Sequence, residues 1–428
     1  MTRAVSARDR TNRQGPGPSG PLAADEQERS SPASLPLSSP LGDENSRRGR
    51  LNAQALDVLR DLGLAGGLHA LGATSADPFP ATRAELERRR DEGLHGGMQF
   101  TYRNPTRSTD PTATLPSART LLVGARSYRR ETPPELEQGG PVGRVARYVW
   151  ADDYGHLRRG LGAVAERLRD DGWKAVVVAD ENNLVDRAAA HRAGLGWFGK
   201  NSNLLLPGHG SWFVLGSVIT DAPLEPSVDA QPQLVPDGCG SCTRCLDSCP
   251  TGAIVAPGVV DARRCLAWSL QVTGPFPREQ RVALADRIYG CDDCQEVCPP
   301  NRRELRVGQP NPPVEPAAAW VAILEMLDMA DDALLARFGH WYVPRRQPRY
   351  LRRNALVVLG NTADPAGHPL VRACLVRYLA DADPMLRAHA AWAVRRLGWT
   401  DLLDAAASDD APEVREELLA SAPPRRTA

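Results

Sequence analysis

The chain has almost no lysine, no long apolar run and no net charge. Lys174 and Lys200 are its only lysines, so its basic side chains are nearly all arginine. The 52 basic and 52 acidic residues cancel, so bulk charge identifies no class of partner. No apolar run approaches the roughly 20 residues of a membrane-spanning helix, and no secretory signal precedes the cysteines. We therefore expect a cytoplasmic protein without a membrane partner.

The length of 428 residues predicts two to three domains. Residues 1–48 are rich in Pro, Gly, Ser and Arg and have no apolar periodicity. This composition predicts a disordered extension ahead of the first domain.

Two cysteine runs are the most informative feature. The first is Cys239-x2-Cys242-x2-Cys245-x3-Cys249-Pro250, and the second is Cys265 followed by Cys291-x2-Cys294-x3-Cys298-Pro299. The first run has the bacterial ferredoxin spacing, in which the fourth cysteine ligates the other cluster. Two 4Fe–4S clusters need eight thiolates, and the two runs contain eight.

The crossed arrangement assigns each cluster four ligands. One cluster takes Cys239, Cys242, Cys245 and Cys298, and the other takes Cys249, Cys265, Cys291 and Cys294. Zinc would favour separate CxxC pairs, and disulfides are disfavoured without a secretory signal. The ninth cysteine, Cys374, lies in an apolar helical stretch and is expected in a core.

Three apolar segments, 120–125, 174–179 and 211–220, are predicted to be strands. Helices are predicted around residues 51–62 and 157–168, the second ended by Gly172. Strands interleaved with helices predict an α/β domain over residues 50–225. Asp180 follows a strand, where ligands of open α/β sheets bind. A cap residue at that position is the alternative role for Asp180.

The stretch from Asp180 to Asn201 is the densest outside the cysteines. It reads DENNLVDR at 180–187 and AGLGWFGKN at 193–201. Three glycines in six residues allow the backbone to approach a bound group closely, although an ordinary turn explains such a loop equally well.

These motifs together resemble the epoxyqueuosine reductase family. The resemblance rests on VADENNLVDR, RAGLGWFGKN, GSWFVLGSVIT, the two cysteine runs and IYGCDDCQEVCP, and it covers about residues 50–420. It implies cobalamin, two 4Fe–4S clusters and reduction of epoxyqueuosine at the tRNA wobble position to queuosine.

The resemblance also implies site residues. Asp180 matches the family's proton donor by its spacing to Asp186 and Arg187. The positions where the family contacts cobalamin are Arg107, Arg147, Asp180, Asn201, Leu204, Leu215, Asp292 and Asp293. Asp292 and Asp293 could equally be turn residues. The chain departs from the family at Gly155, where histidine is usual, and at Asn183, where proline is frequent; both concern the fine substrate identity.

The C-terminal part repeats a Pro, aliphatic pair, Arg theme at 369–372, 384–387 and 412–415. This predicts a HEAT-like helical domain over residues 315–420, after a ferredoxin-type domain over 226–310. Arginines at its entrance, Arg349, Arg352 and Arg353 with their neighbours Arg345 and Arg346, are either a solvated face or contacts to the tRNA anticodon region. Trp341, Tyr342 and Trp392 are stacking candidates that would more ordinarily lie in a core.

Two other functions share parts of this sequence. A corrinoid reductive dehalogenase has the same cofactors, but usually an export signal and no helical array. A non-catalytic ferredoxin-like electron carrier would leave the α/β domain and Asp180 unused. The preferred prediction is a monomeric tRNA-modifying reductase that receives electrons from an external donor such as flavodoxin or ferredoxin.

Overall fold

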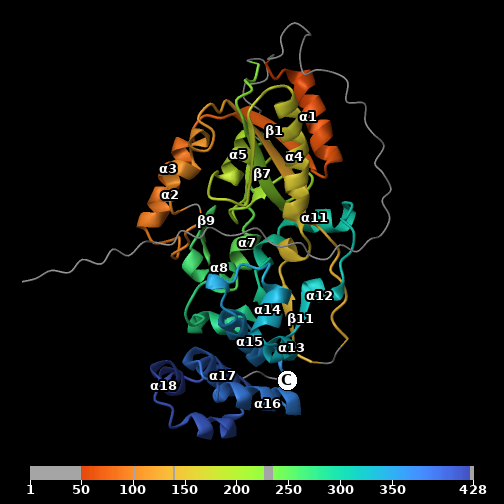
Figure 1. Ribbon diagram of the computed structural model, residues 1–428. Helices are drawn as coiled ribbons and strands as arrows, with labels where there is room; N and C mark the ends of the chain where they lie inside the picture. Colours follow the sequence, from red (N-terminus) through yellow and green to blue (C-terminus); the bar gives the residue numbers. More distant parts are fainter. Residues whose placement is uncertain (1–49, 101, 138–139, 226–234, 425–428) are drawn as a thin grey trace, which may run out of the picture. The chain divides into compact units, whose positions relative to one another are not determined.

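The computed structural model describes residues 50–100, 102–137, 140–225 and 235–424 (Figure 1). The extension predicted to be disordered, residues 1–48, lies outside these ranges. Within the described part, no helix is both long and apolar enough to cross a membrane.

A four-stranded sheet forms the centre of the N-terminal part. Its strands lie in the order β1-β2-β7-β4, and every neighbouring pair is antiparallel. Their bounds are β1 Ala70–Ser75, β2 Thr120–Ser127, β4 Ala175–Ala179 and β7 Phe213–Thr220. The predicted strands correspond to β2, β4 and β7, whereas β1 was not predicted because its sequence, ALGATS, contains few strand-forming residues.

The antiparallel topology corrects one argument made from sequence. Ligand binding beyond the carboxyl ends of strands is a rule for parallel open sheets. β4 is an edge strand paired antiparallel to β7, so that rule gives no support to a site at Asp180.

Helices cover both faces of this sheet. On one face lie α1 (Ala53–Ala65) and α4 (Asp153–Asp170), whose apolar residues share a core with β2 and β7. The predicted apolar stripe of α4 is fully buried and consists of Leu157, Leu161, Val164 and Leu168. α5 (Asp186–Arg192) packs on the opposite face, where Ala189 and Ala190 are fully buried. This part of the chain also contains α2 Pro80–Asp91, α3 Pro105–Ser108, β5 Trp197–Phe198 and β6 Leu204–Leu205.

The cysteine-containing part is built from short elements. They are α7 Arg244–Asp247, β8 Ile254–Ala256, β9 Val259–Val260, α8 Leu266–Ser269, α9 Arg281–Leu284, β10 Arg287–Tyr289, α10 Asp293–Glu296 and α11 Pro299–Val307. Pro299 follows the last ligand candidate and begins α11, where a missing backbone N–H costs no helical hydrogen bond.

A second sheet joins the three predicted domains. β3 (Val142–Val145) is its central strand, parallel to β10 and antiparallel to β11 (Trp320–Ala322). The three strands come from the segments predicted as separate α/β, ferredoxin-type and helical domains. The parts of the chain on either side of each boundary are therefore joined by backbone hydrogen bonds.

The C-terminal part is helical. Its helices are α12 Pro316–Ala319, α13 Ile323–Asp328, α14 Asp331–Phe338, α15 Arg349–Thr362, α16 Pro369–Leu379, α17 Pro384–Leu397 and α18 Pro412–Leu419. Pro369, Pro384 and Pro412 each begin a helix, as the repeated theme predicted. α17 ends at Gly398, whose φ of 80° is a left-handed cap. The core of these helices is continuous with that of the second sheet and part of the cysteine-containing segment. It includes Trp392, Val394 and Cys374.

Candidate functional site

The thiol of Cys298 lies with the first cysteine run. It lines the same cavity, of about 70 Å³, as Cys239, Cys242 and Cys245. Burial, together with the nearby thiolates of those three residues, raises the pKa of Cys298 to about 11. The fold therefore brings Cys298 back across the chain to the first run.

The remaining four cysteines gather elsewhere. Burial raises the pKa of Cys294 well above its ordinary value, and the charges of Cys291, Cys265 and Cys249 raise it further. Burial likewise raises the pKa of Cys265, with a smaller contribution from Cys249. Among the residues that the structure describes, all nine cysteines are free thiols, and no His, Cys, Asp or Glu group has the arrangement of a single-ion site.

Asp180 follows β4 at the start of a turn. Its φ of 57° is left-handed, a conformation that Asp tolerates better than most residues and that is frequent at functional sites. Desolvation raises the pKa of its carboxyl, Glu181 raises it too, and the Arg158 guanidinium opposes both. By surface area the Asp180 side chain is exposed.

A second carboxyl group lies next to Asp180. Asp186 is the first residue of α5, and burial raises its pKa well above the ordinary value. The charge of Asp180 raises that pKa further, while Arg187 lowers it. Two carboxyl groups so coupled do not both ionise readily, so the pair retains a proton to a higher pH than an isolated Asp.

Tyr154 completes this group of acids. Burial raises the pKa of its phenol, and the charges of Asp180 and Asp186 raise it further. The Arg158 guanidinium carbon lies 5.8 Å from the centre of the Tyr154 ring. Asp180, Asp186 and Tyr154 are called the acid group below; each is more readily protonated than the free side chain.

Tyr128 connects the acid group to the second cysteine set. Its hydroxyl accepts a hydrogen bond from Gln295 Nε2 at 2.9 Å. Burial raises the pKa of Tyr128 well above its usual value. The charges of Asp292, Tyr154 and Cys294 raise that pKa further. The phenol thus bonds to the residue that follows Cys294, and its ring lies in the core on which Tyr154 packs.

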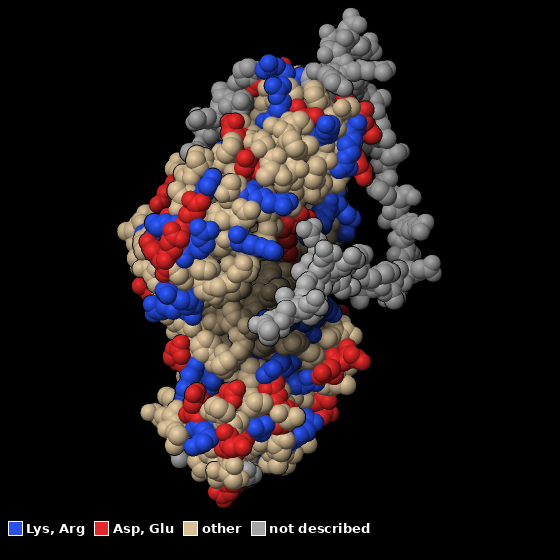
Figure 2. All heavy atoms as spheres, turned by 60° about the vertical axis from the view of Figure 1, so that its left-hand side comes forward, with Lys and Arg blue, Asp and Glu red and all other residues tan. Residues whose placement is uncertain are grey.

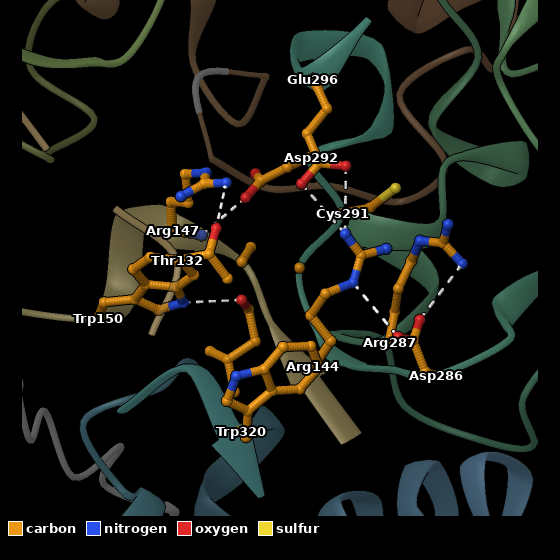
Figure 3. A pocket seen from close by; sticks show the side chains of 13 residues that line it. Thr132, Arg144, Arg147, Trp150, Asp286, Arg287, Cys291, Asp292, Glu296 and Trp320 are labelled. Carbon is orange, nitrogen blue, oxygen red and sulfur yellow. Dashed lines mark hydrogen bonds and ion pairs between the residues drawn. The ribbon is translucent and has the colours of Figure 1, made fainter. Parts of the chain in front are cut away.

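Asp292 and Arg147 line a larger cavity of about 330 Å³ (Figure 3). Asp292 Oδ2 accepts a hydrogen bond from Arg147 N at 2.7 Å, and burial raises the pKa of Asp292 to about 6. The Arg147 guanidinium donates to Arg130 O at 3.0 Å and to Thr132 Oγ1 at 2.8 Å. Cys291 of the second set lines the same cavity.

The other residues predicted to contact cobalamin do not share that cavity. Asp293 pairs with Arg287 at 2.5 Å, so its carboxylate is already engaged. Asn201 is buried and donates from Nδ2 to Cys294 O at 3.2 Å. Leu204 and Leu215 pack with the sheet core, and Arg107 is exposed on α3.

Three residues with a place in this arrangement were not predicted for it. Asp186 served only as a spacing marker, since an acid at the first position of a helix is an ordinary terminus signal. Tyr128 carries no motif, and its location depends on the fold. Lys200 lines the cavity of the first cysteine set, and its place in the GKN segment predicts no role for it.

The comparisons with known proteins identify the cysteine region. Residues 238–301 match the family described as "4Fe-4S double cluster binding domain". This match decides against zinc and disulfides as the purpose of the two runs.

A relative from Lactococcus garvieae is an epoxyqueuosine reductase. It is 34% identical over 341 residues, which cover 77% of this chain and 92% of the relative. The chain belongs to the epoxyqueuosine reductase family. It is therefore an oxidoreductase of the epoxyqueuosine reductase type. The two alternative functions, a reductive dehalogenase and a non-catalytic electron carrier, are not favoured.

Two solved epoxyqueuosine reductases have similar structures. One, with a tRNA-Tyr epoxyqueuosine-modified stem loop, has a TM-score of 0.75 and 29% identity, covering 85% of this chain and 97% of that one. The second is from Bacillus subtilis, with a catalytic aspartate loop swung out of its active site. Its TM-score is 0.74 and its identity 29%, with the same coverage.

Proposed function

We propose that this chain reduces the epoxide of epoxyqueuosine in tRNA to the alkene of queuosine. The net change consumes two electrons and two protons, breaks both C–O bonds and releases water. The observation that carries the proposal is the position of Tyr128, which bonds at 2.9 Å to Gln295, the residue after Cys294, and lies in the core on which Tyr154 of the acid group packs. Proton and electron sources then adjoin each other.

The two cysteine sets are proposed to hold the 4Fe–4S clusters in the crossed arrangement. Their mutual proximity supports this: Cys239, Cys242, Cys245 and Cys298 line one cavity, while Cys249, Cys265 and Cys291 neighbour Cys294. Cysteine thiolates are the usual ligands of such clusters, which pass single electrons at low potential. An external carrier such as flavodoxin or ferredoxin would deliver the electrons.

Asp180 is proposed as the general acid that protonates the departing epoxide oxygen. Its raised pKa keeps the carboxyl protonated nearer to neutral pH, which general acid catalysis requires. Asp186 is the partner carboxyl, and together the two retain one proton to a higher pH than an isolated Asp. The Bacillus subtilis relative, in which a catalytic aspartate loop swings out of the active site, supports a mobile role for the turn at Asp180.

Cobalamin is the proposed partner of the clusters, and the observation that supports it is made at Arg147. Arg147 Nε is buried without a hydrogen-bond partner among the described residues, beside a cavity lined also by Asp292, Trp150 and Cys291. The amide and phosphate groups around a corrinoid supply acceptors for such a donor. The family resemblance assigns to it Arg107, Arg147, Asp180, Asn201, Leu204, Leu215, Asp292 and Asp293, and of these Arg147 and Asp292 line this cavity. Bound there, it supplies cobalt redox chemistry that side chains lack.

The tRNA-binding surface that we propose leaves out Arg353, because this side chain is buried and cannot reach a tRNA phosphate. Its side chain is fully buried and donates to Val272 O, Gly274 O and Asn354 Oδ1. Arg353 is therefore a core residue that ties α15 to the cysteine-containing part. This corrects the prediction for one of the three arginines.

Arg349 and Arg352 are less suited to bind tRNA phosphates, because each is already in an ion pair. Arg349 pairs with Asp383 at 2.7 Å and Arg352 with Asp331 at 2.5 Å, so a phosphate would have to displace a carboxylate. Basic and acidic side chains are interspersed over the face in Figure 2 rather than gathered into one patch.

We propose that tRNA phosphates meet Arg345 and Arg346 on the loop before α15. Both are exposed, and their φ values of 50° and 51° are left-handed. Tyr342, 59% exposed, lies on the same loop and offers a ring for base stacking. Trp341 and Trp392 are buried and are excluded from stacking.

The proposed domain limits remain those predicted: an α/β cobalamin-binding domain at 50–225, a ferredoxin-type domain at 226–310 and a HEAT-like domain at 315–420. The packing of α15, α16 and α18 on α17 supports a helical array.

The test is anaerobic purification followed by turnover. A corrinoid band in the visible spectrum and conversion of an epoxyqueuosine-containing anticodon stem loop to queuosine are expected. A protein that reduces its clusters but never converts this substrate would refute the proposal.

A further inference from the structure

The segment Gly199-Lys200-Asn201 contacts both cysteine regions. Lys200 Nζ donates to Gly240 O at 2.6 Å, and Gly240 lies between Cys239 and Cys242. Lys200 O accepts from Gly258 N at 2.9 Å, in the turn between β8 and β9. The lysine is therefore fixed to the cysteine-containing part by its backbone and by its ammonium group.

Lys200 also lines the cavity of the first cysteine set. That cavity is shared by Cys239, Cys242, Cys245 and Cys298, and most of its remaining wall is apolar, with Trp197, Leu205 and Pro299. Lys200 and Arg244 are the only charged side chains among the described residues that line it. Asp237 and Asp247 do not line it: Asp237 Oδ1 accepts from the backbone N of Cys239 at 2.8 Å, and Asp247, at the end of α7, accepts from Thr243 Oγ1.

The second cysteine set is surrounded by charges of both signs. The nearest charges to Cys291 and Cys294 include the carboxylates of Asp293 and Asp292, with Arg287 as the opposing cation. Cations thus face one set of thiols, whereas carboxylates and a cation face the other.

Reduction adds one electron, and so one negative charge, to a cluster that already carries four thiolates. A fixed cation nearby lowers the free energy of the reduced form more than that of the oxidised form. Net charge and hydrogen bonding around the sulfurs are among the factors that set cluster potentials. An apolar wall weakens screening of that cation by water.

We propose that Lys200 and Arg244 raise the reduction potential of the cluster held by Cys239, Cys242, Cys245 and Cys298. The proposal rests on the two-cluster part of the proposed function. Lys200 acts here through the cluster and touches no substrate. Its bond to Gly240 O holds the ammonium group against the ligand loop.

The chain offers a matched control, because Lys174 is its other lysine. Lys174 is exposed beside β4 and lines neither cavity. Lys200→Gln, Arg244→Gln and Lys174→Gln each remove one cation, while Lys200→Arg moves but keeps the charge. The signal lost in Cys298→Ala identifies the first cluster.

The measurement is a dithionite titration of the anaerobic holoprotein, followed by EPR. Lys200→Gln is expected to lower the one-electron reduction equilibrium constant of the first cluster about tenfold, which is a shift of about 59 mV. Arg244→Gln should act in the same direction. Lys200→Arg should keep the wild-type potential, and Lys174→Gln should change neither cluster.

Unchanged potentials in both Lys200→Gln and Arg244→Gln, at wild-type iron content, would overturn the proposal. If Lys200→Gln loses iron, Arg244→Gln decides, because it leaves the bond to Gly240 O intact. Wild-type protein with fewer than about eight irons would instead contradict the two-cluster assignment. The two failures are therefore distinguishable.

Discussion

Asp180 and Asp186 form a coupled pair of carboxyl groups, six residues apart, in which the charge of Asp180 raises the pKa of Asp186. Desolvation acts on both in the same direction. A site that must release water from an epoxide needs two protons, and this pair can hold one of them well above the ordinary Asp pKa.

Asp180→Asn is expected to fold, bind its clusters and lose most epoxide reduction. The amide keeps the size of the carboxyl but has no proton to transfer, and general acid catalysis contributes about 10² to 10⁴ in rate. Single-turnover conversion of the modified stem loop measures the loss. Asp170→Asn is the control, because Asp170 is an exposed carboxylate at the end of α4 that lines neither cavity. Near wild-type turnover in Asp180→Asn would leave Asp180 as a cap.

The single-turnover rate is expected to fall as pH rises through the raised pKa of the carboxyl pair. The acid form is the active one, so activity persists at lower pH and is lost above that pKa. Glu181→Gln removes a negative charge that raises the pKa of Asp180, so the Asp180 carboxyl ionises more easily. The descending limb of the pH profile should therefore move to lower pH. A limb that stays in place would show that the pair is not the proton source.

Cys298→Ala is expected to damage the cluster of the first run and spare the cluster held by Cys291 and Cys294. The reason is its place in the cavity of Cys239, Cys242 and Cys245. Iron content should fall from about eight toward four, and EPR should retain the second cluster signal. Cys374→Ala, at a buried thiol of α16, serves as the control. Loss of the second cluster alone would refute the crossed assignment.

Arg345→Ala with Arg346→Ala is expected to weaken binding of the tRNA stem loop. Each lost phosphate contact should also reduce the slope of log affinity against log salt by about 0.7 to 0.9. Arg372→Ala, on α16 and paired with Asp401, is a matched exposed control. An unchanged salt slope in the double variant would move the tRNA surface elsewhere.

Arg353→Ala is expected to act on stability instead. Its guanidinium satisfies several buried carbonyl groups, and hydrogen bonds to charged groups contribute about 1.5 to 3 kcal/mol each. The free energy of unfolding, measured by denaturant titration, should drop by about 2 kcal/mol or more. Wild-type stability with weakened tRNA binding would contradict the buried role.

The sequence predicted features that depend on local spacing. The apolar stripe of α4, three of four sheet strands and the proline-started helices follow from periodicity and backbone chemistry. The topology did not follow, because antiparallel pairing of β4 with β7 depends on contacts distant in sequence. The burial of Arg353 was missed for the same reason: a basic run next to a helix start looks exposed until the segment 269–274 packs over it.

The candidate site was predicted in part. Asp180 and the cysteines carry spacing signals, and the structure adds their neighbours. The coupling of Asp186 to Asp180 and the position of Tyr128 arise only when α5, β2 and the segment after β10 come together. Lys200 shows the limit most clearly, since its partner Gly240 lies 40 residues away.

Turnover of defined substrate tests the central claim most directly. The anaerobic holoprotein, supplied with reductant and an anticodon stem loop carrying epoxyqueuosine, is analysed by mass spectrometry of the nucleosides. The account predicts loss of one oxygen atom from the modified nucleoside, giving queuosine, in the wild type but not in Asp180→Asn. Reduced clusters and bound corrinoid with an unchanged nucleoside in the wild type would contradict it.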